Sequence, residues 1–142
     1  MAKVLLVLPH IDIRIGKVVE NAPLPINLIY LGTAIEDKHS VKIYDRNLIP
    51  DDNLFIEYLK DYNPDIIGIN SITGKMLLDL VHIGKMIKKG FPKKIIVVGG
   101  VHATIEPESV LKEPYVDYVI RGEGEAAFLD FCDTFDKNPK KL

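Results

Sequence analysis

The chain has 142 residues, of which 47% are hydrophobic and 27% charged, and its formal net charge is −2. This length suits one domain with its own core, and the intermixed charges give no basic surface of the kind that nucleic-acid binding requires. No apolar run approaches the ~18 residues of a membrane span, and the first apolar run is too short for a signal peptide. We therefore expect a cytoplasmic protein that contacts neither a membrane nor nucleic acid.

The single cysteine, Cys132, excludes an internal disulfide and any metal or iron–sulfur site built from several cysteines of this chain. Its neighbours Phe128, Leu129, Phe131 and Phe135 are apolar. We expect Cys132 to be a small, buried, apolar residue.

Segments rich in β-branched residues alternate with segments of helical periodicity along the chain. In chain order we expect a strand at 3–8, a helix at 26–37, a strand at 41–45, a helix at 52–62, a strand at 66–70 and a helix at 75–89. A strand at 95–98, a short helix from Pro107 that ends before Pro114, a strand at 118–120 and a helix at 123–135 follow.

The strands are almost continuously apolar, which is typical of parallel strands covered on both faces. Alternating strands and helices with short connections predict a doubly wound parallel sheet in three α/β/α layers. Five units favour the flavodoxin-like strand order 2-1-3-4-5 over the dinucleotide-binding order. A ligand of such a fold binds beyond the carboxyl ends of the strands, at the switch point between the first and third strands.

The connection at 9–24 follows the first strand and exceeds the usual 2–6 residues of such loops. It carries His10, Asp12 and Arg14, which we take as candidate ligand contacts. Its isoleucines at 11, 13 and 15 could instead cover or plug the end of the sheet.

The segment Asn70-Ser71-Ile72-Thr73-Gly74 follows the third strand. Small hydroxyl side chains can bond a ligand without filling the crevice, and Gly74 lets the chain turn closely. In the alternative interpretation, Ser71 or Thr73 only caps the next helix.

The segment Gly99-Gly100-Val101-His102 follows the fourth strand. Adjacent glycines at a strand end indicate close approach of the backbone to a ligand, or in the alternative a tight turn. His102 could contact a ligand or have a structural role.

Residues 122–127 match the pattern G-x-G-x-x-A after the last strand. A dinucleotide site would follow the first strand, and Glu123 and Glu125 would repel a pyrophosphate. We favour a capped helix start here.

A phosphoryl-receiver domain would share this fold but needs carboxylates where this chain has Pro9-His10 and Asn70-Ser71.

Several segments, in the same order along the chain, resemble a more specific family. Ser71-Ile72-Thr73 and Gly99-Gly100 resemble two signature elements of the cobalamin-binding domain. The wider set resembles the amino-terminal domains of cobalamin-dependent radical-SAM enzymes; it comprises residues 25–31, 44–48, 97–104 and 118–125.

This resemblance implies a cobalamin-binding domain at 1–136, with 137–142 as a tail or the start of a linker to a radical-SAM domain in the same protein. The nucleotide tail of cobalamin would enter beside Ser71 and Thr73 and pass Gly99-Gly100, with the corrin over the strand ends and the loop 9–24. The implied cofactor-binding residues are His10, Asp12, Arg14, Ser71, Ile72, Thr73, Gly74, Gly99, Gly100, Val101, His102, Gly122 and Glu123.

One departure from the cobalamin-binding pattern concerns the cobalt ligand. Relatives that ligate cobalt through histidine carry Asp-x-His-x-x-Gly, whereas this chain has Arg14 at the histidine position after Asp12, and Gly16 one residue early. The resemblance therefore implies cobalamin held base-off without a histidine ligand.

S-adenosylmethionine and a 4Fe–4S cluster would belong to the second domain of a parent enzyme, which we expect to transfer methyl groups. The alternative is a vestigial domain that docks to the rest of such a protein without cofactor.

Overall fold

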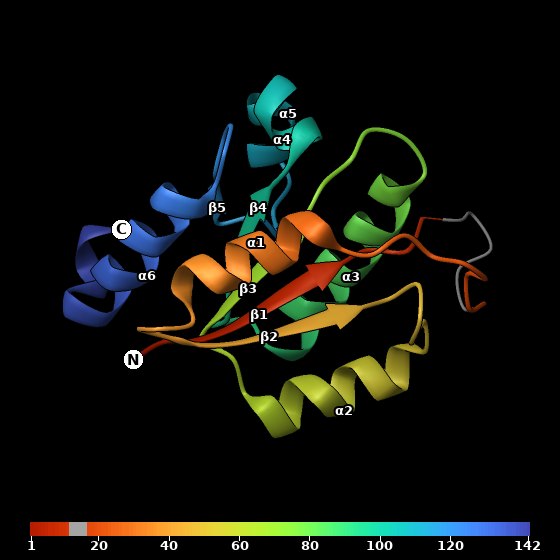
Figure 1. The fold of residues 1–142 in the computed structure, drawn as a ribbon, viewed down its shortest axis with the longest axis horizontal. Helices are drawn as coiled ribbons and strands as arrows, with labels where there is room; N and C mark the ends of the chain where they lie inside the picture. The colour runs from red at the N-terminus through yellow and green to blue at the C-terminus, as the bar shows by residue number, and fades with distance from the viewer. Residues whose placement is uncertain (12–16) are drawn as a thin grey trace.

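The computed structural model describes residues 1–11 and 17–142 and contains a five-stranded parallel sheet (Figure 1). The strand order is β2-β1-β3-β4-β5, as the sequence predicts. The strands are β1 (Lys3–Leu8), β2 (Ser40–Asp45), β3 (Ile66–Asn70), β4 (Ile95–Gly99) and β5 (Tyr118–Val119). Because all strands are parallel, their carboxyl ends lie at one edge of the sheet.

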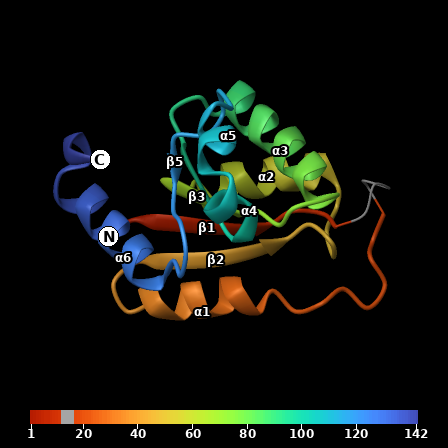
Figure 2. The same ribbon diagram turned by 90° about the horizontal axis from the view of Figure 1, so that it is seen from above.

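Helices cover both faces of the sheet, which confirms the predicted three layers (Figure 2). One face is covered by α1 (Ile26–Ile35) and α6 (Glu125–Lys137), and the other by α2 (Asp52–Tyr62) and α3 (Met76–Gly90). The short helices α4 (Val101–Ile105) and α5 (Pro107–Leu111) link β4 to β5, and a 3₁₀ turn at Pro139–Lys141 follows α6.

Two hydrophobic clusters lie on opposite faces of the sheet because strand side chains alternate in direction. In β1, Leu5 and Val7 pack with α2 and α3, whereas Val4 and Leu6 pack with α1 and α6. These four side chains are fully buried, as expected of a strand covered on both sides.

Local signals explain where some helices begin and end. The Asp51 carboxylate accepts a hydrogen bond from the Leu54 N–H and caps α2, and Asn63 ends the same helix in the left-handed conformation. Helix α4 was not predicted, because five residues are too few to display a helical period. Helix α6 begins two residues later than predicted: Gly122 turns the chain with φ +71°, and the helix starts only at Glu125.

Cys132 is fully buried in the cluster beneath α1 and α6, which confirms the prediction for this residue. Burial raises the pKa of its thiol to about 12. Among the described residues, no helix is long and apolar enough to cross a membrane.

Candidate functional site

The loops that follow β3 and β4 are joined by hydrogen bonds at the carboxyl edge of the sheet. The Ser71 N–H donates to the Gly99 carbonyl at 2.8 Å, and the His102 N–H donates to the Ser71 carbonyl at 3.1 Å. Thr73 Oγ1 and His102 Nδ1 are 3.1 Å apart and form a side-chain bond between the same loops. The two segments singled out in the sequence therefore form one structural unit.

The Ser71 hydroxyl is directed into this unit. It is fully buried, donates to the Gly99 carbonyl at 2.7 Å and accepts from the Ala103 N–H at 3.1 Å. The alternative that Ser71 or Thr73 caps the next helix is wrong, because α3 follows Lys75 without a side-chain cap. Ser71 instead satisfies an N–H in the first turn of α4, which lies beyond the neighbouring strand.

The two adjacent glycines have different roles. Gly100 has φ +99°, and a Cβ there would lie 2.4 Å from Asn70 Oδ1 and 2.6 Å from the Ser71 carbonyl oxygen. Gly99 has no such conflict, since its Cβ would meet only the Ile120 carbonyl oxygen at 3.7 Å. Gly100 is therefore required by the turn, whereas Gly99 leaves space beside the sheet.

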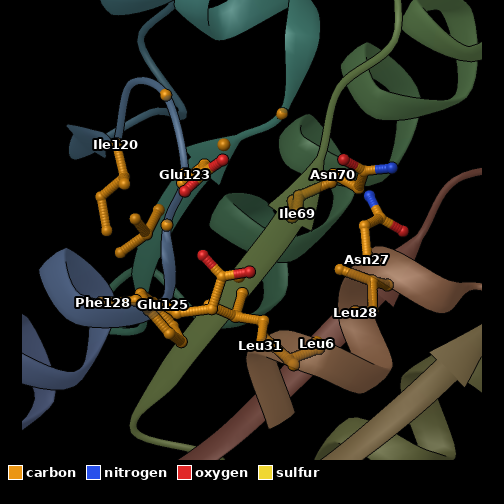
Figure 3. A pocket seen from close by; sticks show the side chains of 16 residues that line it. Leu6, Asn27, Leu28, Leu31, Ile69, Asn70, Ile120, Glu123, Glu125 and Phe128 are labelled. Atoms are coloured by element: carbon orange, nitrogen blue, oxygen red, sulfur yellow. The ribbon is translucent and has the colours of Figure 1, made fainter. Parts of the chain in front are cut away.

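That space is a pocket of about 250 Å³ between the sheet and helices α1 and α6 (Figure 3). Its interior is mainly apolar, and polar groups from α1, β3 and the start of α6 reach its rim. The pocket is lined by Leu6, Asn27, Leu28, Leu31, Gly68, Ile69, Asn70, Val97, Gly99, Gly100, Ile120, Gly122, Glu123, Gly124, Glu125 and Phe128.

The fit of this pocket to a ligand rests on two features. At Gly68 a Cβ would lie 2.9 Å from Leu6 Cδ2 and 3.4 Å from Phe128 Cζ, so the glycine keeps this part of the pocket free of a further side chain. The Asn70 side chain is almost wholly buried, and its Nδ2 has no hydrogen-bond partner in the protein. Buried amides without a partner are rare in native proteins, so this group suits a ligand acceptor.

The rim beside β5 carries two carboxylates. Gly122 and Glu123, predicted as cofactor contacts, line the pocket together with Gly124 and Glu125. The predicted capped start of α6 is wrong as far as side chains are concerned, because Gly124 occupies the cap position and no side chain bonds there. The two glutamates, free of that role, add acceptors to the rim.

The remaining predicted contacts lie outside the pocket. Ile72, Thr73 and Val101 are exposed at the carboxyl edge, and Gly74, with φ +113°, has open space around it. His102 is half-buried beside Thr73. These residues form an upper rim at the strand ends, whereas Gly99 and Gly100 connect this rim to the pocket.

The described ends of the loop 9–24 are fastened to the sheet edge. His10 is fully buried, with its Nε2 2.6 Å from the Lys17 carbonyl oxygen. The Asn47 side chain accepts from the Ile11 N–H at 2.8 Å, and the Asn47 carbonyl accepts from the Val19 N–H at 2.8 Å. Asn47 therefore holds both ends of the loop.

Two other predicted contacts, Asp12 and Arg14, and the possible plugging residues at 13 and 15 lie outside the described residues. None of the described residues of this loop lines the pocket.

A buried ion pair supports the base of this loop. Arg46 and Asp79 are fully buried, with Arg46 Nε 2.8 Å from Asp79 Oδ2 and Arg46 Nη2 3.0 Å from Asp79 Oδ1. The His10 N–H donates to the same Asp79 Oδ2 at 2.7 Å. This ion pair was not predicted, although Arg46 lies within residues 44–48, one of the segments that resemble the family.

Comparisons with known proteins agree with this geometry. The family model described as B12 binding domain matches residues 14–131. The chain is 36% identical over 139 residues to the uncharacterized methyltransferase PH0819 of Pyrococcus horikoshii, covering 95% of this chain and 30% of that protein. It is 28% identical over 133 residues to cytidylyl-2-hydroxyethylphosphonate methyltransferase of Streptomyces wedmorensis, covering 80% of this chain and 25% of that protein.

Among solved structures, the cobalamin-dependent S-adenosylmethionine radical enzyme OxsB with aqua-cobalamin bound superimposes with a TM-score of 0.74. The sequence identity is 26%, and the match covers 96% of this chain and 19% of OxsB. The chain thus spans less than a third of the length of these relatives. From the family match and the structural likeness together, the chain belongs to the B12-binding domain family and is related to cobalamin-dependent radical-SAM enzymes.

Proposed function

We propose that this chain binds cobalamin and holds it for a radical-SAM enzyme. The observation that carries the proposal is the apolar pocket that opens beside Gly99 and Gly100 at the carboxyl edge of the sheet. Ligands of this fold class bind at that edge. The match to the B12 binding domain family supports cobalamin as this ligand.

The pocket is sized for part of the cofactor. Its volume of about 250 Å³ is below the ~300–1,000 Å³ typical of sites that enclose a whole drug-sized ligand. The apolar walls, including Leu28, Ile120 and Phe128, suit the flat heteroaromatic base of the nucleotide tail. The corrin would then lie outside, over the upper rim formed by the loops after β3 and β4.

No histidine of the chain lines the pocket, and each of the four has a partner in the fold. His10 is held against Lys17, His39 and His82 bond to aspartates, and His102 contacts Thr73. These arrangements support cobalamin bound without a protein imidazole on cobalt. A tail base held in the apolar pocket would be kept away from cobalt, which is the base-off form. The bound cofactor would supply a cobalt centre that carries a methyl group, and the protein positions and shields it.

The reaction belongs to the whole enzyme, of which this chain is the cofactor-holding part. Relatives that are methyltransferases favour methyl transfer in the parent protein. We propose that S-adenosylmethionine and a 4Fe–4S cluster are held by a separate radical-SAM domain, since this chain has one buried cysteine.

The proposal is tested by titrating the purified protein with hydroxocobalamin and methylcobalamin, followed by absorbance and by co-elution from a sizing column. We expect both to bind, and the methylcobalamin complex to have a base-off spectrum. A folded protein that binds neither would contradict the proposal and favour the vestigial docking module. Repeating the titration with a longer form of the protein would separate that outcome from a site shared with the radical-SAM domain.

A further inference from the structure

Asn70 is the last residue of β3, where the strand reaches the rim of the pocket. Its side chain is 3% exposed, yet its Nδ2 has no hydrogen-bond partner. Two other buried side-chain atoms among the described residues also lack partners, Tyr44 Oη and Arg46 Nη1, but neither residue lines the pocket. A buried amide donor of this kind needs an acceptor, and in this place a bound molecule can supply it.

The Asn70 side chain lies against its neighbour in the turn, Gly100. Gly100 lies so close that a Cβ there would be 2.4 Å from Asn70 Oδ1. In Figure 3 the amide nitrogen of Asn70 lies on the side of Asn27, whose own amide lines the same end of the pocket. The pocket therefore has an end with two amide groups.

The polar groups of the rim are unevenly distributed. Glu123 and Glu125 stand on the β5 side, where ionised carboxylates accept hydrogen bonds and repel anions. The amides of Asn27 and Asn70 stand on the α1 side, where N–H groups are available to acceptors. An acceptor-rich or anionic part of a ligand is therefore favoured beside the asparagines, and a hydroxyl or amide donor beside the glutamates.

Resting on the proposed function, we infer that Asn70 Nδ2 donates a hydrogen bond to an oxygen of the sugar–phosphate part of the cobalamin tail. The flat base occupies the apolar interior, and the linker that leaves it passes the amide end of the pocket. Asn70 is then a specificity-determining residue, because it distinguishes corrinoids that carry this tail from those that lack it. It contributes nothing to binding of the corrin ring itself.

The test compares hydroxocobalamin with aquacobinamide, which has the corrin but not the nucleotide tail. Asn70→Asp replaces the amide nitrogen with oxygen in nearly the same shape, so it removes the donor and adds a charge that repels phosphate. We expect hydroxocobalamin binding about 10- to 100-fold weaker than in the wild type, as for loss of a hydrogen bond to a charged group. The affinity for aquacobinamide should change less than about twofold, which corresponds to a negligible difference in binding free energy.

Two further variants keep the test decisive. Asn53→Asp makes the same substitution on the exposed face of α2 and should bind both corrinoids as the wild type does. Asn70→Ala removes the donor without burying a charge, and it replaces Asn70→Asp if that variant fails to fold.

The possible results separate the inference from the function on which it rests. Unchanged hydroxocobalamin binding in both Asn70 variants, or equal losses for the two corrinoids, would overturn the inference while the proposed function stands. A wild type that prefers neither corrinoid would likewise show that the tail makes no specific contact. A folded wild type that binds neither corrinoid would overturn the proposed function itself.

Discussion

Thr73 Oγ1 lies 3.1 Å from His102 Nδ1, and this contact joins the loop after β3 to the loop after β4. Together with the backbone bond from His102 to Ser71, it makes the upper rim of the pocket a single unit. Gly99 ends β4 and Gly100 begins the loop that follows in this unit, and both line the pocket. We therefore expect a substitution at Gly99 to weaken ligand binding and a substitution at Gly100 to lower the stability of the fold.

Gly99→Val is expected to abolish cobalamin binding, weakening it by at least about 100-fold, while the fold remains intact. A Cβ at this position meets only the Ile120 carbonyl oxygen at 3.7 Å, so the added side chain enters the pocket and not the protein core. Binding is measured by absorbance titration and folding by circular dichroism. Tight binding by a folded Gly99→Val protein would contradict this path for the nucleotide tail.

Gly100→Ala is the matched control for that experiment. Its methyl group would conflict with Asn70 Oδ1 and the Ser71 backbone, and its φ of +99° is unfavourable for alanine. We expect the free energy of unfolding to fall by about 1–3 kcal/mol, measured by urea denaturation.

Ser71→Ala is expected to act mainly on stability. The hydroxyl links the Gly99 carbonyl to the Ala103 N–H, so its removal leaves a buried donor without its acceptor. The expected loss is about 1–3 kcal/mol of unfolding free energy, whereas Thr73→Val, at an exposed hydroxyl, should cost less than about 1 kcal/mol. Unchanged stability with lost cobalamin affinity would show instead that the Ser71 hydroxyl contacts the ligand directly.

The strand order and the meeting of the Ser71 and Gly99 segments could be predicted because both follow from chain pattern. Alternating apolar strands and helices specify a doubly wound sheet, and neighbouring parallel strands bring their carboxyl ends together. The direction of the Ser71 hydroxyl could not be predicted. It depends on α4, a helix too short to leave a periodic signal.

The pocket itself was only half predicted. The glycines that line it at the end of β4 were predicted as ligand contacts. Asn27, Leu28 and Phe128 were not, because they lie on helices α1 and α6, far from those glycines in sequence. Which helix residues reach a pocket depends on how α1 and α6 sit over the sheet, and local periodicity does not determine that position. Asn70 was named only as the first residue of its segment. As a polar residue that ends an otherwise apolar strand, it could have been singled out as a ligand contact.

His10→Ala is expected to leave the absorption spectrum of bound cobalamin unchanged. His10 is fully buried and its Nε2 lies 2.6 Å from the Lys17 carbonyl oxygen, so its ring is engaged within the protein. Stability should fall, because the substitution empties a buried site. His102→Ala, at the half-buried rim, is the comparison variant. A spectral change on His10→Ala alone would show that this histidine reaches cobalt.

Cys132 provides a test of binding that does not depend on the colour of the cofactor. The thiol is fully buried and its pKa is raised to about 12, so roughly one molecule in ten thousand carries the reactive thiolate at pH 8. A thiol reagent such as DTNB should therefore modify the native protein only through unfolding, and modify it rapidly in denaturant.

Because Cys132 is the sole cysteine, the reaction reports one site. A ligand that binds only the folded state lowers the unfolded population, so hydroxocobalamin at about 100 times its Kd should slow modification about 100-fold. The Gly99→Val protein, with its pocket blocked, should show no such protection. Protection of both proteins to the same degree would place the cobalamin elsewhere on the molecule, and protection of neither would mean that the folded chain does not bind it.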